Sequence, residues 1–356
     1  WDVEGKKYID MLSSYSAINQ GHLHPRIVKA AKDQMDKVTL TSRAFCNDRM
    51  GPFLKKLCEV TGMDVALPMN TGAEAVETSI KVARRWAHMN KGIPEDEGDI
   101  IVMENNFHGR TTTIISFSSD PDSKRGFGPF TPGFVMVPYN NLRAVEKAIT
   151  SKTVGILVEP IQGEAGINIP SPGYLKELRR ICDEHRILLI LDEIQTGWAR
   201  TGKMFAFQHE GIKPDVLCVG KALGGGLYPV SASLARKDIM DVFTPGSHGS
   251  TFGGNPLAAA IGEAAIDVLI DEKLAENAEK MGAYFVKRLE EIRNPKIKEI
   301  RQKGLLIGVE FHLGKDETVR PICEKLMAKG VLAKDTHEKT VRFAPPPVIT
   351  TAAIDW

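Results

Sequence analysis

Short apolar runs alternate with amphipathic helical segments through the first two thirds of the chain. Residues 99–104, 153–158, 187–191 and 215–219 have the continuous apolar character of buried strands. The stretch 172–185 has apolar positions at helical spacing and basic residues towards its end, so it predicts a crossover helix. Another helix is predicted over 73–88. This alternation is typical of an α/β protein with a mostly parallel sheet covered by helices.

The pattern changes after about residue 256. An Ala-rich segment (256–271) and a charged amphipathic helix (274–293) lead into a strand-like run at 304–311, a helix near 319–329 and a strand-like run at 340–344. This order predicts a smaller α+β unit, although no linker rich in Pro, Gly or Ser marks its border. The chain contains no internal repeat.

Composition excludes several classes of protein. Hydrophobic residues make up 42% of the 356 and charged residues 26%, as in an ordinary globular protein. The 46 Lys and Arg balance the 45 Asp and Glu, so nothing indicates a nucleic acid or an anionic membrane surface as partner. Aliphatic runs reach about five residues, far short of a membrane span. Five scattered cysteines without a C-x-x-C pair favour a reducing compartment over disulfides or zinc.

Nucleotide-binding and metal-binding signals are incomplete. Residues 197–203 have the G-x-x-x-x-G-K spacing of a phosphate loop, but Met204 stands where a hydroxyl would hold Mg²⁺. No G-x-G-x-x-G follows a predicted strand, which disfavours dinucleotide binding. The histidines of 22–24 and the His-Glu pair at 209–210 lack further ligands at suitable spacing. We therefore expect no metal site and interpret these histidines as structural or surface groups.

The start of the 73–88 helix has the features of an anion site. Thr71, Gly72 and Ala73 stand at its entrance, where free N–H groups and the helix dipole attract negative charge. Gly72 also allows a ligand to approach the backbone closely. A plain helix cap by Asn70 or Thr71 explains the same residues, and on this segment alone it is the better interpretation.

Two charged residues follow predicted strands directly. Asp192 comes after the 187–191 strand, where the carboxyl edge of a parallel sheet binds ligands, and its carboxylate could pair with a protonated ring nitrogen. Its neighbour Glu193 could be a surface residue or an ion-pair partner. Lys221 follows the 215–219 strand and precedes three glycines. Removal from water would lower the pKa of its amine and make it a nucleophile, whereas a lone lysine is ordinarily a surface residue.

A second donor loop lies further along the chain. In HGSTFGGNP, residues 248–256, Ser250 and Thr251 offer hydroxyl and backbone donors to a phosphate. Each of these segments alone is a glycine-rich turn. Together the helix start, the strand-end Asp192, the strand-end Lys221 and this loop compose a site for pyridoxal 5′-phosphate, with a phosphate cradle, a partner for the ring nitrogen and a reactive amine.

Long ungapped runs of the chain resemble the class-III aminotransferases of fold type I, across essentially its whole length. Among these, the chain looks most like the members that act on ornithine. The resemblance implies a large, mostly parallel seven-stranded domain and a smaller α+β domain. The matching runs are LSSYSAINQGHLHP, TSRAFCN, LPMNTGAEAVET, NNFHGRT, GFGPFTPGF, VEPIQGEAG, LDEIQTGWARTG, GKALGGGLYPVSA, HGSTFGGNP and VRFAPP.

The resemblance implies roles around the cofactor ring. Lys221 would bond covalently to the cofactor and later shuttle a proton between substrate and cofactor. Asp192 would keep the pyridine nitrogen protonated, so that the ring remains an electron sink. Phe107 would stack on the ring face, and Gln195 would lie near the phenolic oxygen.

The resemblance also implies how the phosphate is bound. Gly72 and Ala73 would supply N–H groups from the same chain. Ser250 and Thr251 would reach the phosphate of a neighbouring subunit. The implied assembly is therefore a homodimer, or a dimer of dimers, with shared active sites.

Four residues are implied in substrate choice. Arg110 and Arg342 are both suited to bind a substrate carboxylate through the bidentate guanidinium fork. An enzyme that handles a distal amine first and an α-amine second must hide and then expose one of these arginines. Glu164 would pair with Arg342 in the first half-reaction and release it in the second, and Tyr15 would line the pocket. Without the resemblance, packing and a surface ion pair would explain Tyr15 and Glu164.

The implied activity transfers the δ-amino group of L-ornithine to 2-oxoglutarate. The products are glutamate and glutamate 5-semialdehyde, which cyclises to pyrroline-5-carboxylate, in proline biosynthesis or arginine catabolism. N-acetylornithine and 4-aminobutyrate are alternative amine donors, because their aminotransferases share the cofactor motifs. A nucleotide-binding oxidoreductase and a non-catalytic cofactor-binding scaffold are alternatives from other classes.

Three parts of the chain are expected. Residues 1–40 would pack with the small domain, 41–260 would form the large cofactor-binding domain, and 261–356 would form the small domain. The chain starts at Trp1 rather than Met, so we expect a piece of a longer protein that lacks an upstream tyrosine for the substrate's α-amino group and the end of the small domain. We expect the cytoplasm, or the mitochondrial matrix in a eukaryote.

Overall fold

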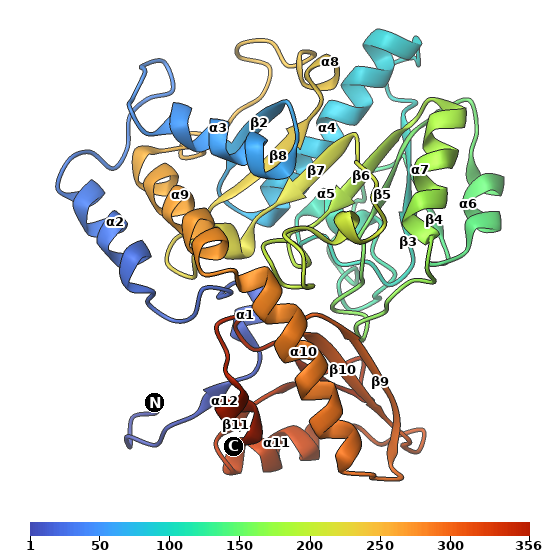
Figure 1. Cartoon of the computed structure of the whole chain (residues 1–356). Coiled ribbons are helices and arrows are strands. Elements are labelled where there is room, and N and C mark those ends of the chain that lie inside the picture. Colours follow the sequence, from blue (N-terminus) through green and yellow to red (C-terminus); the bar gives the residue numbers. More distant parts are fainter.

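The computed structural model describes residues 1–356 and contains one large and one small β-sheet body (Figure 1). Strand β8 runs antiparallel to both of its neighbours, and the other strands of the large sheet are parallel. The α/β class with a mostly parallel seven-stranded sheet is therefore confirmed. In spatial order the strands are β2 (Val65–Met69), β8 (Ser231–Ala235), β7 (Val216–Val219), β6 (Leu188–Asp192), β5 (Thr153–Val158), β3 (Asp99–Met103) and β4 (Phe134–Val137).

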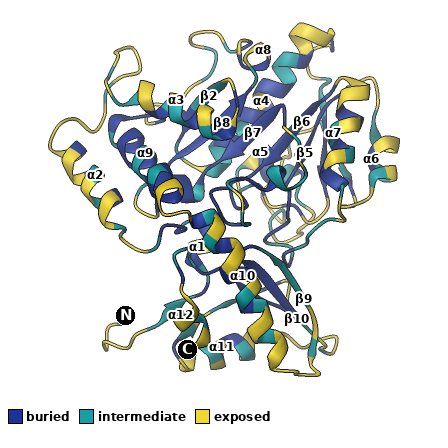
Figure 2. Cartoon of the chain, in the orientation of Figure 1, coloured by how far each residue is buried: buried dark blue, intermediate teal, exposed yellow.

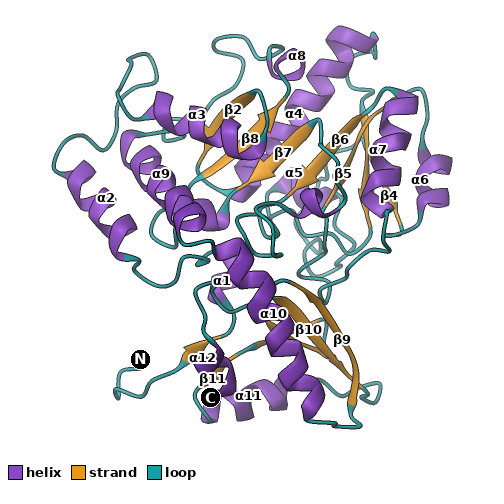
Figure 3. Cartoon of the chain, viewed as in Figure 1, coloured by secondary structure: helices purple, strands orange, loops and turns teal.

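Helices cover both faces of the large sheet (Figure 3). Alternate residues of β6 pack on opposite sides, Leu189 in one core cluster and Ile190 in the other, and so the central strands are buried throughout (Figure 2). One face carries α2 (Pro25–Met35), α3 (Met50–Thr61), α6 (Leu142–Ala148), α7 (Tyr174–His185) and α9 (Pro256–Asp271). The other face carries α4 (Gly72–Lys91), α5 (Thr112–Ser116) and α8 (Lys237–Met240).

A smaller antiparallel sheet forms the second body. Its order is β12 (Lys334–Thr336), β13 (Thr340–Phe343), β10 (Leu306–Phe311) and β9 (Ile297–Lys303). The start of the chain joins this body, because β1 (Ile9–Asp10) pairs in parallel with β11 (Val331–Leu332). The small core also includes residues of α10 (Leu274–Glu291), α11 (Arg320–Ala328) and α12 (Thr351–Asp355).

Arg200 ties the two bodies together. Its guanidinium is fully buried and donates to the carbonyls of Leu305 at 2.8 Å and Pro345 at 2.6 Å, and to Asn19 Oδ1 at 2.5 Å. Gly304 makes the approach close, since a Cβ there would lie 2.4 Å from the backbone of Thr201. The division into 1–40, 41–260 and 261–356 stays a prediction; helix α9 runs across residue 261 and packs against α2 and α3.

The predicted strands and helices are present, with shifts of a few residues at their ends. The regular elements that the apolar pattern did not predict include four strands, β2, β4, β8 and β9. Three of them, β2, β4 and β9, are edge strands: β2 contains Pro68, which is tolerated at an edge, and about half of β9 is charged. No helix combines the length and apolar character needed to cross a bilayer.

Candidate active site

Lys221 and Asp192 meet at the carboxyl edge of the large sheet. Asp192 ends β6, and Lys221 begins a 3-10 turn, η2 (Lys221–Gly224), which is separated from the end of β7 by Gly220 alone. Lys221 has a φ of 48°, in the left-handed region that residues with a side chain adopt infrequently. Both residues line one cavity of about 190 Å³, together with Gly72, Ala73, Phe107, His108, Gly109, Glu159, Ile161, Ile194, Gln195 and Thr196.

The surroundings of Lys221 lower the pKa of its amine and so favour the neutral form. Removal from water lowers the pKa of Lys221 to about 8, the carboxylate of Glu164 opposes this shift, and the positive charge of Arg342 adds to it. A neutral amine at near-neutral pH is a nucleophile, because its lone pair is free to attack a carbonyl carbon. The lysine is therefore not an ordinary surface residue, because it is half-buried and lines the cavity.

Asp192 is held by a histidine that the sequence did not single out. His108 Nδ1 lies 2.7 Å from Asp192 Oδ2, and the Ile194 N–H donates to Asp192 Oδ1 at 3.0 Å. Burial of His108 opposes its protonation, but the bond to Asp192 outweighs burial and raises the pKa of the imidazole. Two donors therefore orient the carboxylate that faces the cavity. Nothing in the sequence around His108 indicates that this histidine contacts Asp192.

Two further carboxyl groups are buried beside Asp192. Burial raises the pKa of Glu159 to about 8, with His108 opposing the shift, and this residue accepts from the Phe107 N–H at 3.1 Å. Burial raises the pKa of Glu193 to about 7. Glu193 is neither a surface residue nor an ion-pair partner: it accepts from Thr196 Oγ1 at 2.6 Å and from two backbone N–H groups of the 205–208 turn.

The start of α4 is a capped helix end whose first residues line the Lys221 cavity. Thr71 caps the helix by accepting from the Glu74 N–H at 3.3 Å, and the Glu74 side chain accepts from the Thr71 N–H at 2.7 Å. Gly72 and Ala73 nevertheless line the Lys221 cavity. The capping interpretation and the anion-site interpretation are compatible, because the cap uses the Thr71 and Glu74 N–H groups and does not use those of Gly72 and Ala73.

Ser250 and Thr251 lie outside this cavity. They line a separate hollow of about 570 Å³ with Leu40, Thr41, Ser42, Arg43 and Gly249. Ser250 Oγ accepts from Asn70 Nδ2 at 2.9 Å, so the loop is anchored just before the start of α4. Within one chain these two residues do not line the Lys221 cavity. Their contact with the cofactor phosphate of a neighbouring subunit stays a prediction.

Glu164 covers Arg342 beside Lys221. Arg342 Nη1 donates to Glu164 Oε1 at 2.6 Å, and Gln195 Nε2 donates to the same oxygen at 3.0 Å. Arg342 is 1% exposed, whereas the Glu164 side chain is 27% exposed. Burial works against ionisation of Glu164, but Arg342 and then Lys221 outweigh it and hold its pKa below the ordinary value. The pair is therefore a charged one with its carboxylate on the open side.

Tyr15 lies against this pair from the N-terminal segment. Its ring centroid is 5.5 Å from Arg342 Cζ and 5.9 Å from Lys334 Nζ. The short helix α1 (Ser13–Ser16) is a left-handed turn, with φ between 48° and 69° at all of its residues. Such a turn costs about 1–2 kcal/mol per residue, and Asp10 fixes its entry by accepting from the Leu12 and Ser13 N–H groups.

Arg110 differs from Arg342 in exposure and in pairing. It is exposed, it forms no ion pair, and its Cζ lies 5.9 Å from the Phe107 ring centroid. It lines a hollow of about 440 Å³ that also contains Asp120 and Asp122, next to the Phe107 that closes the Lys221 cavity. No group of three or more His, Cys, Asp or Glu side chains is arranged to hold a metal ion.

The donor set of the cavity fits pyridoxal phosphate. It offers the Lys221 amine with its lowered pKa, the Asp192 carboxylate for a ring nitrogen, the aromatic ring of Phe107 and the start of α4 for a phosphate. Gln195 Oε1 is buried and has no partner in the chain, and Gly163 makes room for it, since a Cβ there would lie 1.5 Å away. This unpartnered polar atom indicates that the cavity is built for a polar ligand.

Comparison with known proteins decides the family. The sequence model described as aminotransferase class-III matches residues 1–356. The chain belongs to the class-III aminotransferase family. This membership confirms the predicted enzyme class, an aminotransferase that depends on pyridoxal phosphate.

Relatives of known name are similar over the whole chain. An ornithine aminotransferase of Brevibacillus brevis is 58% identical over 355 residues, which is 100% of this chain and 88% of the relative. A crystal structure of the ornithine aminotransferase from Toxoplasma gondii ME49 superposes with a TM-score of 0.98 at 46% identity, over 100% of this chain and 85% of that one. An acetylornithine aminotransferase from Elizabethkingia anophelis has a TM-score of 0.90 at 48% identity, over 99% and 88%.

Proposed function

We propose that this class-III aminotransferase is an ornithine δ-aminotransferase. It would transfer the δ-amino group of L-ornithine to 2-oxoglutarate and produce glutamate 5-semialdehyde and glutamate. The amino group is exchanged for a carbonyl oxygen, so the overall reaction needs no external oxidant or reductant. The observation that carries this proposal is the Glu164–Arg342 pair beside Lys221; the ornithine aminotransferases that are 55–58% identical over the whole chain support it.

The residues divide the chemistry among them. When bound, pyridoxal phosphate supplies an electron sink for negative charge at the amine-bearing carbon. Nζ of Lys221 would move a proton from that carbon to the cofactor, a transfer that its lowered pKa favours. Asp192, oriented by His108, would hold a proton on the ring nitrogen. Phe107 would exclude water from one face of the ring.

The two arginines explain how one site accepts two different amines. Ornithine must present its distal amine to Lys221, which places its α-carboxylate far from the reacting carbon, within reach of an outer group such as Arg110. Glutamate must present its α-amine, so its α-carboxylate lies close to the reacting carbon. Arg342 is the arginine beside Lys221, and Glu164 hides it until the second substrate arrives. This gating favours a δ-amine donor first.

We further propose a homodimer with shared sites. The hollow with Ser250 and Thr251 contains the partnerless Arg43, and Leu40 and Phe252 are exposed apolar side chains beside it. Such a surface suits a second copy of the chain whose cofactor phosphate would receive these donors. The cytoplasm stays the compartment that we propose, because the five scattered cysteines are free thiols.

Turnover of three amine donors tests the proposed substrate. With 2-oxoglutarate as acceptor, we expect kcat/KM for L-ornithine to exceed that for N-acetylornithine and for 4-aminobutyrate. The acetylornithine enzyme is the strongest rival, since a structure of that name is 48% identical to this chain. A preference for N-acetylornithine or 4-aminobutyrate would overturn the ornithine assignment and leave the family assignment intact.

A further inference from the structure

A row of residues crosses the small sheet and includes Arg342, which with Glu164 forms the ion pair that we call the substrate switch. Arg301 on β9 stands opposite Gly308 on β10, which stands opposite Arg342 on β13, which stands opposite Lys334 on β12. Directly opposed residues of antiparallel strands place their side chains on the same face. Arg301 and Arg342 therefore project to one side of the sheet, with a glycine between them.

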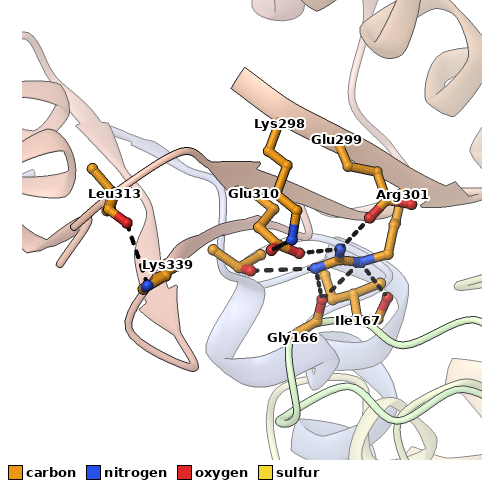
Figure 4. A network of polar contacts seen from close by, with 9 residues as sticks. Gly166, Ile167, Lys298, Glu299, Arg301, Glu310, Leu313 and Lys339 are labelled. Atoms are coloured by element: carbon orange, nitrogen blue, oxygen red, sulfur yellow. Dashed lines mark hydrogen bonds and ion pairs between the residues drawn. The ribbon is translucent and has the colours of Figure 1, made fainter. Parts of the chain in front are cut away.

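The loop that carries Glu164 lies across this row. Gly308 makes space for it, since a Cβ at that position would lie 3.1 Å from the Gly166 carbonyl oxygen. Arg301 grips the loop backbone: Nη2 donates to the Gly166 carbonyl at 2.8 Å, and Nε lies 3.2 Å from the carbonyls of both Gly166 and Ile167 (Figure 4). One arginine thus uses its fork on two consecutive main-chain acceptors rather than on a substrate.

Neighbouring carboxylates orient Arg301 for this grip. Glu299 accepts from its Nη1 at 2.6 Å and Glu310 at 2.5 Å, while Lys298 donates to Glu310 at 2.6 Å (Figure 4). The Arg301 side chain is 15% exposed, so most of its charge is met by these partners rather than by water. The guanidinium is consequently fixed in position and neutralised locally.

A second contact holds the loop at Glu164 itself. Thr336 Oγ1, on β12, donates to the Glu164 carbonyl at 2.5 Å. Arg301 and Thr336 therefore fix the main chain at Glu164 and at the second and third residues beyond it, from the two edge strands β9 and β12 of the small sheet. Only the Glu164 side chain, which is partly exposed, retains freedom to leave Arg342.

We propose that Arg301 is a positioning residue of the substrate switch: it fixes the loop main chain, so that Glu164 uncovers Arg342 by side-chain rotation alone. This inference rests on the proposed function. A fixed loop keeps the carboxylate at high effective concentration beside Arg342, and so the arginine is hidden unless an incoming carboxylate competes for it. A loosened loop would leave Arg342 uncovered part of the time and admit α-carboxylate compounds in the first half-reaction.

The cofactor-loaded enzyme and its Arg301→Met variant provide the test. Single-turnover changes in the visible absorption give kcat/KM for L-ornithine and for L-glutamate, and we expect their ratio to fall about tenfold, since a lost hydrogen bond from a charged group has an effect of this order. Hydrogen exchange of the Ile167 and Asn168 amides, which bond within the loop, should become faster. Lys298→Met is the matched control, because it removes a cation from the same network without touching the loop.

Thr336→Val keeps the test decisive if Arg301→Met does not fold. It removes one hydroxyl at constant shape, and we expect a change in the same direction of about threefold. Faster loop exchange with an unchanged ornithine-to-glutamate ratio would overturn the positioning role, as would an equal change in Lys298→Met. If the wild-type enzyme does not react with ornithine, the proposed function fails. If the hydrogen exchange of the Ile167 and Asn168 amides is unchanged in both variants, Arg301 and Thr336 do not fix the loop main chain, and the positioning role is overturned.

Discussion

Arg110 and Arg342 are the same residue type in opposite settings. Arg110 is exposed and unpaired near Phe107, whereas Arg342 is 1% exposed and lies 2.6 Å from Glu164. An exposed guanidinium is available to any carboxylate, but it also gains little from each because water and ions screen it. A buried guanidinium binds strongly once its own partner is displaced. Under the proposed function, the contrast means that the order of substrates would depend on which arginine is covered and not on which arginine is present.

Loss of Lys221 should abolish the reaction with both kinds of substrate, whichever arginine binds them. In Lys221→Ala, we expect both half-reactions to fall by about 10³-fold or more, because the group that moves the proton is gone. The visible absorption of the lysine-bound cofactor should disappear as well. Lys213→Ala, at an exposed lysine, is the control. Survival of absorption and turnover in Lys221→Ala would contradict the assignment of the reactive amine.

Loss of Arg110 should affect both substrates. We expect Arg110→Ala to raise KM for L-ornithine and for 2-oxoglutarate by about 10- to 100-fold, the usual effect of removing a charged hydrogen bond. Steady-state kinetics with each substrate varied in turn measure this. Arg125→Ala is the control, at an exposed arginine of the same segment. An effect confined to one substrate would mean that Arg110 is gated as well.

The pH at which Lys221 becomes reactive reports its pKa, which burial and the nearby positive charge of Arg342 both lower. Its pKa of about 8 means that the amine is protonated and unreactive below that pH and neutral above it. The rate at which the cofactor-free protein binds pyridoxal phosphate covalently should therefore rise about tenfold from pH 7 to pH 9 and then level off. Stopped-flow absorbance follows this rate. A rise that continues towards pH 10.4, as for a lysine in water, would contradict the buried setting.

Removal of the Glu164 charge should leave Arg342, like Arg110, without an ion-pair partner. In Glu164→Gln, Arg342 loses its charged partner, so we expect the preference for L-ornithine over L-glutamate in the first half-reaction to fall about fivefold to tenfold. Single-turnover rates with each amine give this ratio, and Glu146→Gln at the surface is the control. An unchanged preference would mean that covering Arg342 does not set the order of substrates.

The sequence predicted the buried strands that have continuous aliphatic runs, and it missed β8, which is equally buried but has the sequence SASLA. The central strands β5 and β6 are buried on both faces, so their apolar runs are continuous, and Lys221 and Asp192 stand out at strand ends. Edge strands carry a mixed pattern: β2 contains Pro68, and β9 carries charges on a half-exposed face. Their pairing depends on neighbours that are distant in sequence, which no local pattern records.

The same limit separates the predicted site residues from those that were missed. His108 and Arg301 act through partners 84 and 135 residues away, Asp192 and Gly166. A histidine or arginine on its own indicates neither contact. Glu164 and Arg342, which are 178 residues apart, were paired through the family resemblance rather than through any pattern in the chain.

The fate of the two nitrogens of ornithine tests the account most directly. L-Ornithine labelled with ¹⁵N at the δ position, incubated with the enzyme and unlabelled 2-oxoglutarate, should give ¹⁵N-labelled glutamate, whereas α-labelled ornithine should give unlabelled glutamate. Mass spectrometry of the glutamate reads out both experiments. Transfer of the α nitrogen would contradict the account, because a covered Arg342 is proposed to direct the distal amine to Lys221.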